Sequence, residues 1–151
     1  MSAPPSTYQA NLNPREELAV SGAALSQAPW KLAGATGVVV TGADMLAHLV
    51  FLHPELFPPL SWGIVTFFAV AGAGALVRSR HSRALRWARS RPWRFAVVPG
   101  AAAAILIFAL TVLHGSSIPG SVFTALWHGA ITYGVTGMAG SVVRPRRQAR
   151  G

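Results

Sequence analysis

Four long apolar stretches constrain the fold of this chain more than any other feature. They run over residues 31–53, 60–77, 95–114 and 119–143. A helix needs about 20 predominantly apolar residues to cross the hydrocarbon core of a bilayer, and each stretch is close to that length. Charged residues make up only 11% of the 151 positions, against about 25% in a typical soluble domain. The sequence therefore predicts an all-α membrane protein with four transmembrane helices.

Short connectors join these spans in pairs. The first, residues 54–59, reads Pro-Glu-Leu-Phe-Pro-Pro, and its prolines cannot continue a helix. The second covers residues 115–118. Because short connections join antiparallel neighbours, we expect two tandem helical hairpins, at residues 31–77 and 95–143. An N-terminal segment (1–30), a basic linker (78–94) and a basic tail (144–151) complete the chain.

Arginine is distributed unevenly around these hairpins. The linker and the tail hold eleven arginines, whereas the two hairpin turns hold none. Basic loops stay on the cytoplasmic side, so we expect the linker and the tail to be cytoplasmic in the cell membrane. With an even number of spans the N-terminus is then cytoplasmic too. The linker arginines are Arg78, Arg80, Arg83, Arg86, Arg89, Arg91 and Arg94, and those of the tail are Arg144, Arg146, Arg147 and Arg150.

The N-terminal segment contains a helix start. Asn13 is suited to cap a helix that begins at Pro14, with Glu16 and Glu17 near its positive end. Two alternatives are open for this segment: a short amphipathic helix that runs to about Ala28 and rests on the membrane surface, or a frayed tail. The acidic pair also argues against a secretory signal, which needs positive charge there.

The two hairpins share three blocks of sequence. Residues 29–33 recur at 92–96, the Leu-His pair at 52–53 recurs at 113–114, and residues 73–80 recur at 139–146. The offsets are 63, 61 and 66. This order predicts a parallel internal repeat, with the copies related by an axis along the membrane normal. Convergence on shared roles at the two membrane interfaces is the alternative explanation.

Ionisable side chains are rare within the spans. Asp44 is the only acid there, and His48 follows one helical turn later. If the first and fourth spans are neighbours, Asp44 and His48 form an intramembrane polar cluster with residues of the fourth span. Such a cluster indicates either a proton, ion or ligand site or an interhelical hydrogen-bonding clamp, and we favour the clamp. The expected members are Asp44, His48, His128, Thr132 and Tyr133.

Small residues at a spacing of four let membrane helices approach closely. Three such pairs are expected to pack helices together, either within the chain or against a second copy or a larger membrane subunit. They are Ala71 with Ala75, Ala130 with Gly134, and Gly137 with Ser141.

The arginines from residue 78 onward have no Asp or Glu in the same region. We therefore expect their counter-ions to come from anionic lipid, an acidic partner or solvent. The linker is expected to lie among lipid headgroups, with Trp87 and Trp93 reaching into the interface. Nucleic acid is a poor candidate because the linker is tied to the bilayer at both ends.

Catalytic and cofactor motifs are missing from the sequence. The chain has no cysteine, which excludes disulfides and thiolate sites. It also lacks a Ser-His-Asp pattern, a phosphate-binding glycine loop and paired carboxylates. We therefore expect no enzymatic activity, no cofactor and no metal. Paired histidines, either His48 with His128 or His53 with His114, leave haem or metal binding as a third alternative.

Two functions rank above that alternative. The first is a non-enzymatic accessory or scaffold subunit that binds other membrane proteins and anionic lipid. The second is a small oligomeric carrier or proton-coupled permease, with Asp44, His48 and His128 forming its polar path.

Overall fold

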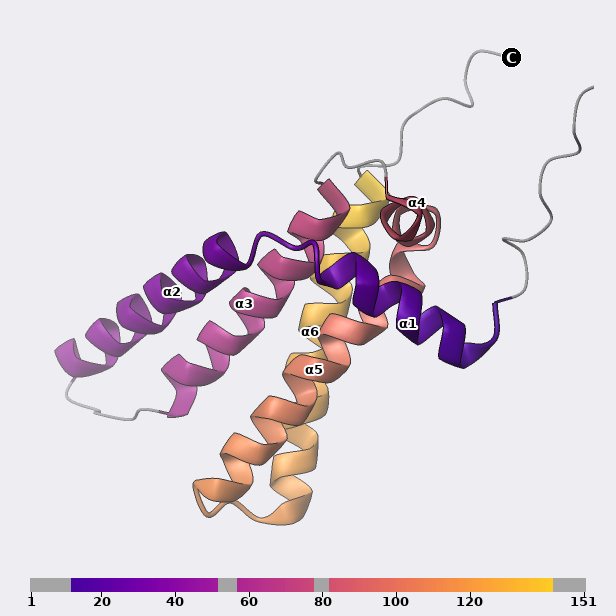
Figure 1. The fold of residues 1–151 in the computed structure, drawn as a ribbon. Helices are drawn as coiled ribbons and strands as arrows, with labels where there is room; N and C mark the ends of the chain where they lie inside the picture. The colour runs from indigo at the N-terminus through magenta and orange to yellow at the C-terminus, as the bar shows by residue number, and fades with distance from the viewer. Residues whose placement is uncertain (1–11, 52–56, 78–81, 143–151) are drawn as a thin grey trace, which may run out of the picture.

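The computed structural model describes residues 12–51, 57–77 and 82–142, and this part of the chain is helical without strands. Three of its helices are long and apolar enough to cross a membrane, namely α2, α3 and α5. Figure 1 shows the six helices, which are α1 (Pro14–Leu25), α2 (Trp30–Val50), α3 (Phe57–Val77), α4 (Arg83–Ser90), α5 (Pro92–Leu113) and α6 (Ile118–Val142).

Helix α6 corresponds to the fourth expected span but is not among those three candidates. It is the longest helix, with 25 residues, and contains no Asp, Glu, Lys or Arg. Its glycines, hydroxyl side chains and one histidine lower its mean hydropathy. The apolar character of α6 is thus weaker than that of α3 and α5.

Two antiparallel helix pairs form the body of the structure. Helix α2 packs on α3, and α5 packs on α6, which is the most extensive helix contact in the described chain. Helix α3 also packs on both α5 and α6, so it joins the two pairs. Figure 1 shows α2 leaning outward on the far side of α3 from α5 and α6.

Two helices, α3 and α5, begin earlier than the sequence predicts. Helix α3 begins at Phe57 rather than Leu60, and α5 begins at Pro92 rather than Phe95. The prolines of residues 54–59 were expected to interrupt the chain between two helices, whereas Pro58 and Pro59 lie inside α3. In the first turn of a helix the backbone N–H has no intrahelical partner, so proline is well tolerated there. Pro58, Pro59 and Pro92 all occupy such positions.

A Schellman motif ends α5 and starts the turn to α6. Gly115 has a φ of +87°, a left-handed conformation that glycine adopts without steric cost. The N–H of Ser116 donates to the Thr111 carbonyl at 3.1 Å, and the N–H of Gly115 donates to the Val112 carbonyl at 3.0 Å. This glycine fixes a tight reversal between the two helices.

Helix α1 begins at Pro14, and Asn13 is its N-cap, as the sequence predicts. The Asn13 side chain accepts a hydrogen bond from the Arg15 N–H at 2.9 Å, and the Asn13 N–H donates to Glu16 at 3.0 Å. The helix ends at Leu25, a little before the expected Ala28. It packs mainly on α4, and smaller contacts reach α3 and α5.

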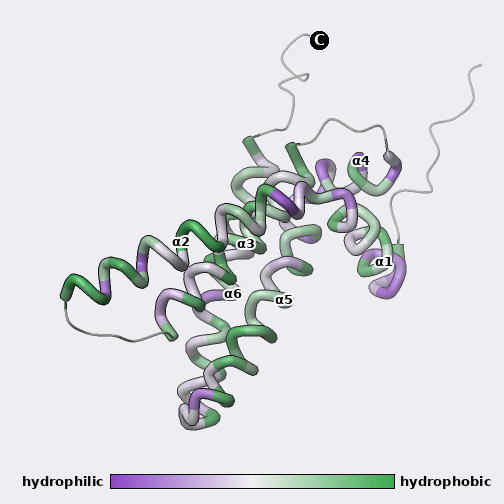
Figure 2. The backbone as a smooth tube through the Cα atoms, turned by 60° about the vertical axis from the view of Figure 1, so that its left-hand side comes forward, coloured by the Kyte–Doolittle hydropathy of each residue, from purple (hydrophilic) through white to green (hydrophobic). Residues whose placement is uncertain are grey.

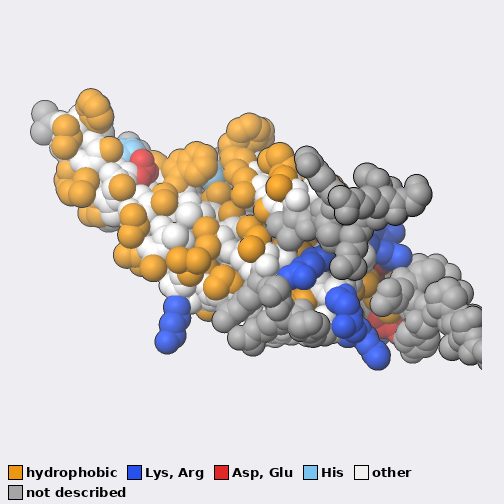
Figure 3. Space-filling model, turned by 90° about the horizontal axis from the view of Figure 1, so that it is seen from above, with side chains coloured by type: hydrophobic (Ala, Val, Ile, Leu, Met, Phe, Trp, Pro, Cys, Tyr) orange, Lys and Arg blue, Asp and Glu red, His pale blue; other side chains and the backbone are white. Residues whose placement is uncertain are grey.

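The helices differ in polarity according to their place in the fold. In Figure 2 the long helices α2, α3 and α5 are mostly hydrophobic, whereas α1 and α4 carry hydrophilic segments. Both short helices lie where α3 ends and α5 begins, opposite the hairpin turns (Figure 1). In Figure 3 hydrophobic side chains cover most of the visible surface of the long helices. Most of the visible Lys and Arg side chains lie towards the right of the view, the side on which Figure 1 shows α1 and α4. One end of the structure is therefore basic.

Candidate functional site

Glycines allow the closest approach in the first hairpin. A Cβ atom added to Gly37 of α2 would lie 3.0 Å from the Gly63 carbonyl oxygen of α3 and 3.2 Å from the Phe67 Cβ. A Cβ added to Gly63 would lie 3.1 Å from the Gly37 carbonyl oxygen and would overlap the Thr41 hydroxyl. Both positions lack room for a side chain, so the two backbones are in direct contact.

A matching contact joins α5 and α6 in the second hairpin. A Cβ added to Gly100 would lie 3.0 Å from the Gly129 carbonyl oxygen and 3.1 Å from the Tyr133 Cβ. A Cβ added to Gly129 would lie 3.0 Å from the Gly100 carbonyl oxygen and 2.8 Å from the Ala104 Cβ. This pair of helices is also held by glycine at its closest point.

An aromatic contact flanks each glycine pair on the side of the basic end. The rings of Trp30 and Phe67 lie 5.7 Å apart in the first hairpin, and those of Trp93 and Tyr133 lie 5.4 Å apart in the second. Offset or tilted aromatic pairs at this separation contribute about 0.5–1.5 kcal/mol beyond the burial of their area. Tyr133 is thereby placed in a helix-packing contact.

These contacts involve positions at fixed offsets in the sequence. The α2 residues Trp30, Gly37 and Thr41 correspond to Trp93, Gly100 and Ala104 of α5 at an offset of 63. The α3 residues Gly63 and Phe67 correspond to Gly129 and Tyr133 of α6 at an offset of 66. Pro29 against Gly74 and Pro92 against Gly140 form another such pair of contacts. The offsets equal those of two of the three repeated sequence blocks.

Asp44 and His48 lie on one face of α2, with their side chains 31% and 29% exposed. The His48 Nδ1 is 2.9 Å from the backbone carbonyl oxygen of Asp44 and 3.8 Å from its carboxylate Oδ1. Asp44 Oδ2 is buried without a hydrogen-bond partner. Within the described chain, no hydrogen bond links Asp44 or His48 to another helix.

His128, Thr132 and Tyr133 lie on α6. The His128 Nδ1 is 2.8 Å from the Thr124 carbonyl oxygen, and the Thr132 hydroxyl donates to the His128 carbonyl oxygen at 3.0 Å. Across the helix interface, the His128 ring meets the edge of the Trp62 ring on α3, with 5.6 Å between centroids. His128 and Thr132 thus find partners within α6, whereas the buried hydroxyl groups of Ser121 and Thr136 on the same helix have no hydrogen-bond partner among the described residues.

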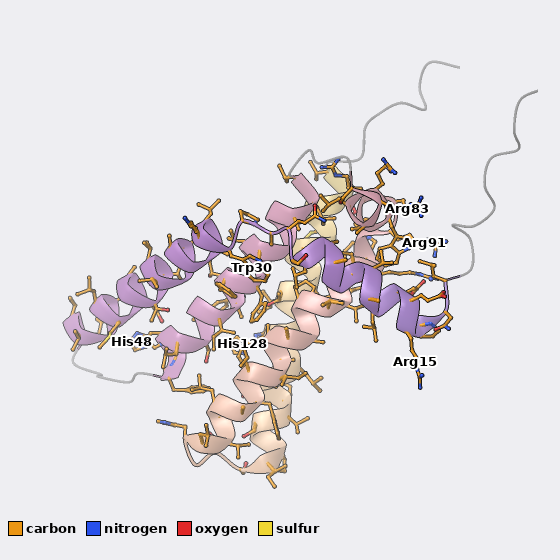
Figure 4. The ribbon with its side chains drawn as sticks, viewed as in Figure 1. Arg15, Trp30, His48, Arg83, Arg91 and His128 are labelled. Atoms are coloured by element: carbon orange, nitrogen blue, oxygen red, sulfur yellow. The ribbon has the colours of Figure 1, made fainter. Side chains whose placement is uncertain are left out.

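The five residues of the expected polar cluster are divided between two places. Helix α2 packs on α3 rather than extensively on α6, so the expected neighbourhood of the first and fourth spans is replaced by contact between α3 and α6. Figure 4 shows His48 on α2 and His128 on the opposite side of α3. Asp44 and His48 therefore lie apart from the three residues on α6.

The other histidine pair is only partly described. His53 lies outside the described residues, whereas His114 caps the end of α5 and stacks on Phe57 with 5.6 Å between ring centroids. Among the described residues, no group of three or more His, Asp or Glu side chains could hold a metal ion. His114 thus contributes an aromatic contact between the two hairpins near their turns.

The six residues expected to pack helices have different surroundings. Ala71 and Ala75 are fully buried, and Gly137 lies directly under the Trp93 ring. Ala130 is exposed, Gly134 has open space around its Cα, and the Ser141 hydroxyl donates to the Gly137 carbonyl. The glycines at the closest helix contacts, Gly37, Gly63, Gly100 and Gly129, were not identified from the sequence. Their spacing at the repeat offsets is the signal that could have found them.

Acidic and basic side chains connect α1 to the start of α5. Glu17 pairs with Arg91 at 3.5 Å and also with Arg94. Two linker arginines therefore take their counter-ion from the N-terminal helix, which corrects the expectation of external counter-ions for all of them. The expectation failed because it searched only for acids near the arginines in sequence.

A further arginine interacts with the end of α3. Arg89 Nε donates to the Leu76 carbonyl oxygen at 2.7 Å, and a cation there also complements the negative end of the helix dipole. Arg83 and Arg86 are exposed on α4, whereas Arg78 and Arg80 lie outside the described residues. The basic linker thus has internal structural contacts as well as exposed cations.

Trp87 lies inside the protein rather than in the membrane interface. It is only 5% exposed and belongs to an apolar cluster with Ala24 of α1, Leu76 of α3 and Leu85 of α4. Trp93 is 43% exposed but covers Gly137. The expectation that both indoles reach out from the linker was wrong for Trp87, because α1 packs over α4.

An apolar groove of about 420 Å³ runs between α1 and α4. This volume lies in the range of small-molecule sites, which is about 300–1,000 Å³. Trp87 is one of its walls, and the indole Nε1 of this residue is buried without a hydrogen-bond partner. The lining residues are Leu12, Ala19, Val20, Ala23, Arg83, Ala84 and Trp87.

Comparison of the chain with known protein families, curated proteins and solved structures finds no match in any of the three.

Proposed function

We propose that the chain is a four-span membrane protein with both ends in the cytoplasm. Three candidate spans and the uncharged 25-residue α6 support this topology. Thr132 and Ser141 of α6 donate to carbonyls of their own helix, which lowers the cost of placing these two hydroxyl groups in a bilayer. The arginine-rich end formed by α1 and α4 would then face the cytoplasm.

The two hairpins are copies of one ancestral unit under this proposal. The duplication is supported by the contacts described above. Glycine, tryptophan and proline make equivalent contacts in the two hairpins, at positions related by offsets of 63 and 66. Both hairpins enter from the same side, so the copies are related by an axis along the membrane normal. A duplicated hairpin explains why one packing solution appears twice.

We further propose that the protein acts without catalysis as an accessory or scaffold subunit that binds other membrane proteins and anionic lipid. The observation that carries this proposal is the open surface of α2. In the most apolar stretch of α2 only 11% of positions are buried, against 33% in the equivalent α5 and 44% in α3. Helix α5 packs on both α6 and α3, whereas α2 packs extensively on α3 alone.

A partner helix could dock on α2 without displacing any contact within the chain. Small-residue contact and shape complementarity drive helix association in a bilayer, where apolar area alone gives little preference for protein over lipid. Gly34 and Gly42 of α2 both have open space around their Cα atoms. They would let another helix, from a larger subunit or a second copy, approach closely.

Photocrosslinking from single positions in native membranes tests this function. Leu46 of α2 and Ile105 of α5 are matched sites, with exposures of 65% and 68%. A photoreactive residue at Leu46 is expected to give one saturable protein adduct of constant mass, and the same residue at Ile105 is expected to label lipid. Equal labelling of protein from both sites, or of lipid alone from both, would contradict docking on α2.

The carrier function remains a second candidate because of one atom. Asp44 Oδ2 is buried without a partner, and an ionisable group within a span commonly marks a proton or ion path. The separation of Asp44 from His128 weighs against a path that uses both. A carrier would therefore depend on Asp44 and His48, together with whatever covers α2.

A further inference from the structure

The groove between α1 and α4 combines three features that a phospholipid would satisfy. Its walls are apolar, and Arg83 is the one charged residue among them. It lies at the basic end of the structure, where α3 ends and α5 begins (Figure 1). If the spans cross the bilayer as proposed above, the groove is at the level of the lipid headgroups.

The apolar walls of the groove suit an acyl chain. Trp87 of α4 forms one wall and is only 5% exposed, and Val20 and Ala23 of α1 lie among the facing residues. A phospholipid has its phosphate directly beside its acyl chains, so one ligand can fill the apolar groove and place an anion beside Arg83.

Charge favours an anionic headgroup over a zwitterionic one. Arg83 lies on the wall of the groove, is exposed, and has no hydrogen bond or ion pair with any described residue. Arg91 and Arg94, by contrast, already pair with Glu17. Figure 4 shows Arg83 on α4 and Arg15 at the start of α1, where its side chain points away from α4. Arg83 is therefore placed to hold a phosphate, and Arg15 is not.

We propose that this groove binds one acyl chain of an anionic phospholipid from the cytoplasmic leaflet, with Arg83 holding its phosphate. The proposal rests on the membrane topology and lipid binding proposed above. It differs from general attraction between a basic surface and an anionic membrane in its stoichiometry, since it requires one lipid in one groove.

Native mass spectrometry of the full chain tests the site. The protein is reconstituted in nanodiscs of equal parts phosphatidylglycerol and phosphatidylcholine with identical acyl chains, then transferred to mild detergent. One phosphatidylglycerol is expected to remain bound. Each cation near an anionic surface contributes about 1 kcal/mol, so Arg83→Gln should lower the phosphatidylglycerol preference about fivefold, and the matched control Arg15→Gln should leave it nearly unchanged.

A second pair of variants separates the groove from the charge. Ala23→Trp fills the groove and leaves every arginine in place, so it is expected to abolish the retained lipid. Ala35→Trp adds the same side chain to an exposed position of α2 and should have no effect. Both proteins must keep their helix content by circular dichroism. Retention of the lipid by folded Ala23→Trp, or equal effects of Arg83→Gln and Arg15→Gln, would overturn the proposal.

The chain's own N-terminal segment is the other conceivable occupant. The chain contains no cysteine, so a Ser6→Cys, Ala23→Cys double variant reports on this directly. Complete disulfide formation in nanodiscs would show that residues near Ser6 fill the groove and would overturn the lipid site. If the unaltered protein shows no preference for phosphatidylglycerol over phosphatidylcholine, the broader proposal of anionic-lipid binding is overturned instead.

Discussion

The Trp62 ring on α3 meets the His128 ring on α6 edge-on, with 5.6 Å between ring centroids. Residue 62 and residue 128 are separated by 66 positions, the offset that also relates Gly63 to Gly129 and Phe67 to Tyr133. In a structure with approximate two-fold symmetry, a residue that touches its own counterpart lies near the symmetry axis. This contact thus supports an axis between α3 and α6 for the proposed duplication.

A double-mutant cycle measures this contact. We expect Trp62→Ala and His128→Ala each to lower the thermal stability of the protein in detergent, with a coupling of about 0.5–1.5 kcal/mol between them. Trp127 is 58% exposed on α6, so Trp127→Ala should show no coupling with Trp62→Ala. Additive effects of Trp62→Ala and His128→Ala would show that the two hairpins do not dock through α3 and α6.

The glycine contacts predict paired effects on stability. Gly63→Ala and Gly129→Ala force a methyl group against a facing backbone carbonyl, at 3.1 and 3.0 Å respectively. Overpacking of this kind typically costs about 1–3 kcal/mol. Both variants should therefore unfold at lower temperature in a detergent thermal-shift assay.

Two other glycines on the same hairpins are matched controls. Gly42 on α2 and Gly134 on α6 have no atom within 4 Å of an added Cβ. Alanine should be neutral there, or stabilising by up to about 1 kcal/mol through its better helix propensity. If all four variants behave alike, the two close approaches are not the points that hold the hairpins together.

Local features of the structure could be predicted from the sequence because their causes are local. The Asn13 cap and three of the four expected spans follow from residue types and hydrophobic length. The early starts of α3 and α5 also have a local cause, the tolerance of proline in a first helical turn. The start of α3 was missed because the prolines of residues 54–59 were interpreted only as an interruption, although proline was expected at the first position of α1.

Contacts between distant segments could not be predicted in the same way. The pairing of Glu17 with Arg91 joins residues 74 positions apart, and nothing in the linker indicates which acid approaches it. Likewise, hydrophobic length does not determine which faces of four helices meet. The sequence allowed contact between the first and fourth spans but provided no physical reason for it. In the structure α3 takes the central position, where Gly63 lies against α2 and Gly72 lies against α5 and α6.

The topology predicts which positions a cytoplasmic reagent can reach. Because the chain has no cysteine, single cysteines at Ser6, Ser82 and Gln148 can each be labelled separately in inverted and right-side-out vesicles. All three are expected to react from the cytoplasmic side, and a cysteine at Ser117, in the turn between α5 and α6, only from the other side. Reaction of Ser117 and Ser82 from the same side would exclude the proposed four spans.

Asp44 separates the two candidate functions. In a clamp His48 would be expected to hold the Asp44 carboxylate, yet the His48 Nδ1 is nearer to the Asp44 backbone carbonyl oxygen, at 2.9 Å, than to Oδ1, at 3.8 Å. Oδ2 is buried with no partner. A clamp needs hydrogen bonds to another helix, and the described chain provides none at Asp44, so replacing this side chain should not weaken helix packing.

We therefore expect Asp44→Leu to leave the unfolding temperature unchanged or to raise it, since replacing an unsatisfied buried polar group with an apolar one removes a desolvation cost. Asp44→Asn keeps the shape of the side chain but removes the ionisable proton. If the chain is a scaffold, both variants should still form the adduct expected from Leu46 on α2. If it is a carrier, both should remain folded and fail to restore proton-dependent uptake to proteoliposomes in which the unaltered protein is active. A large loss of stability in Asp44→Leu would instead show that Asp44 holds α2 in place through a partner outside the described chain, and a clamp would then be the correct interpretation.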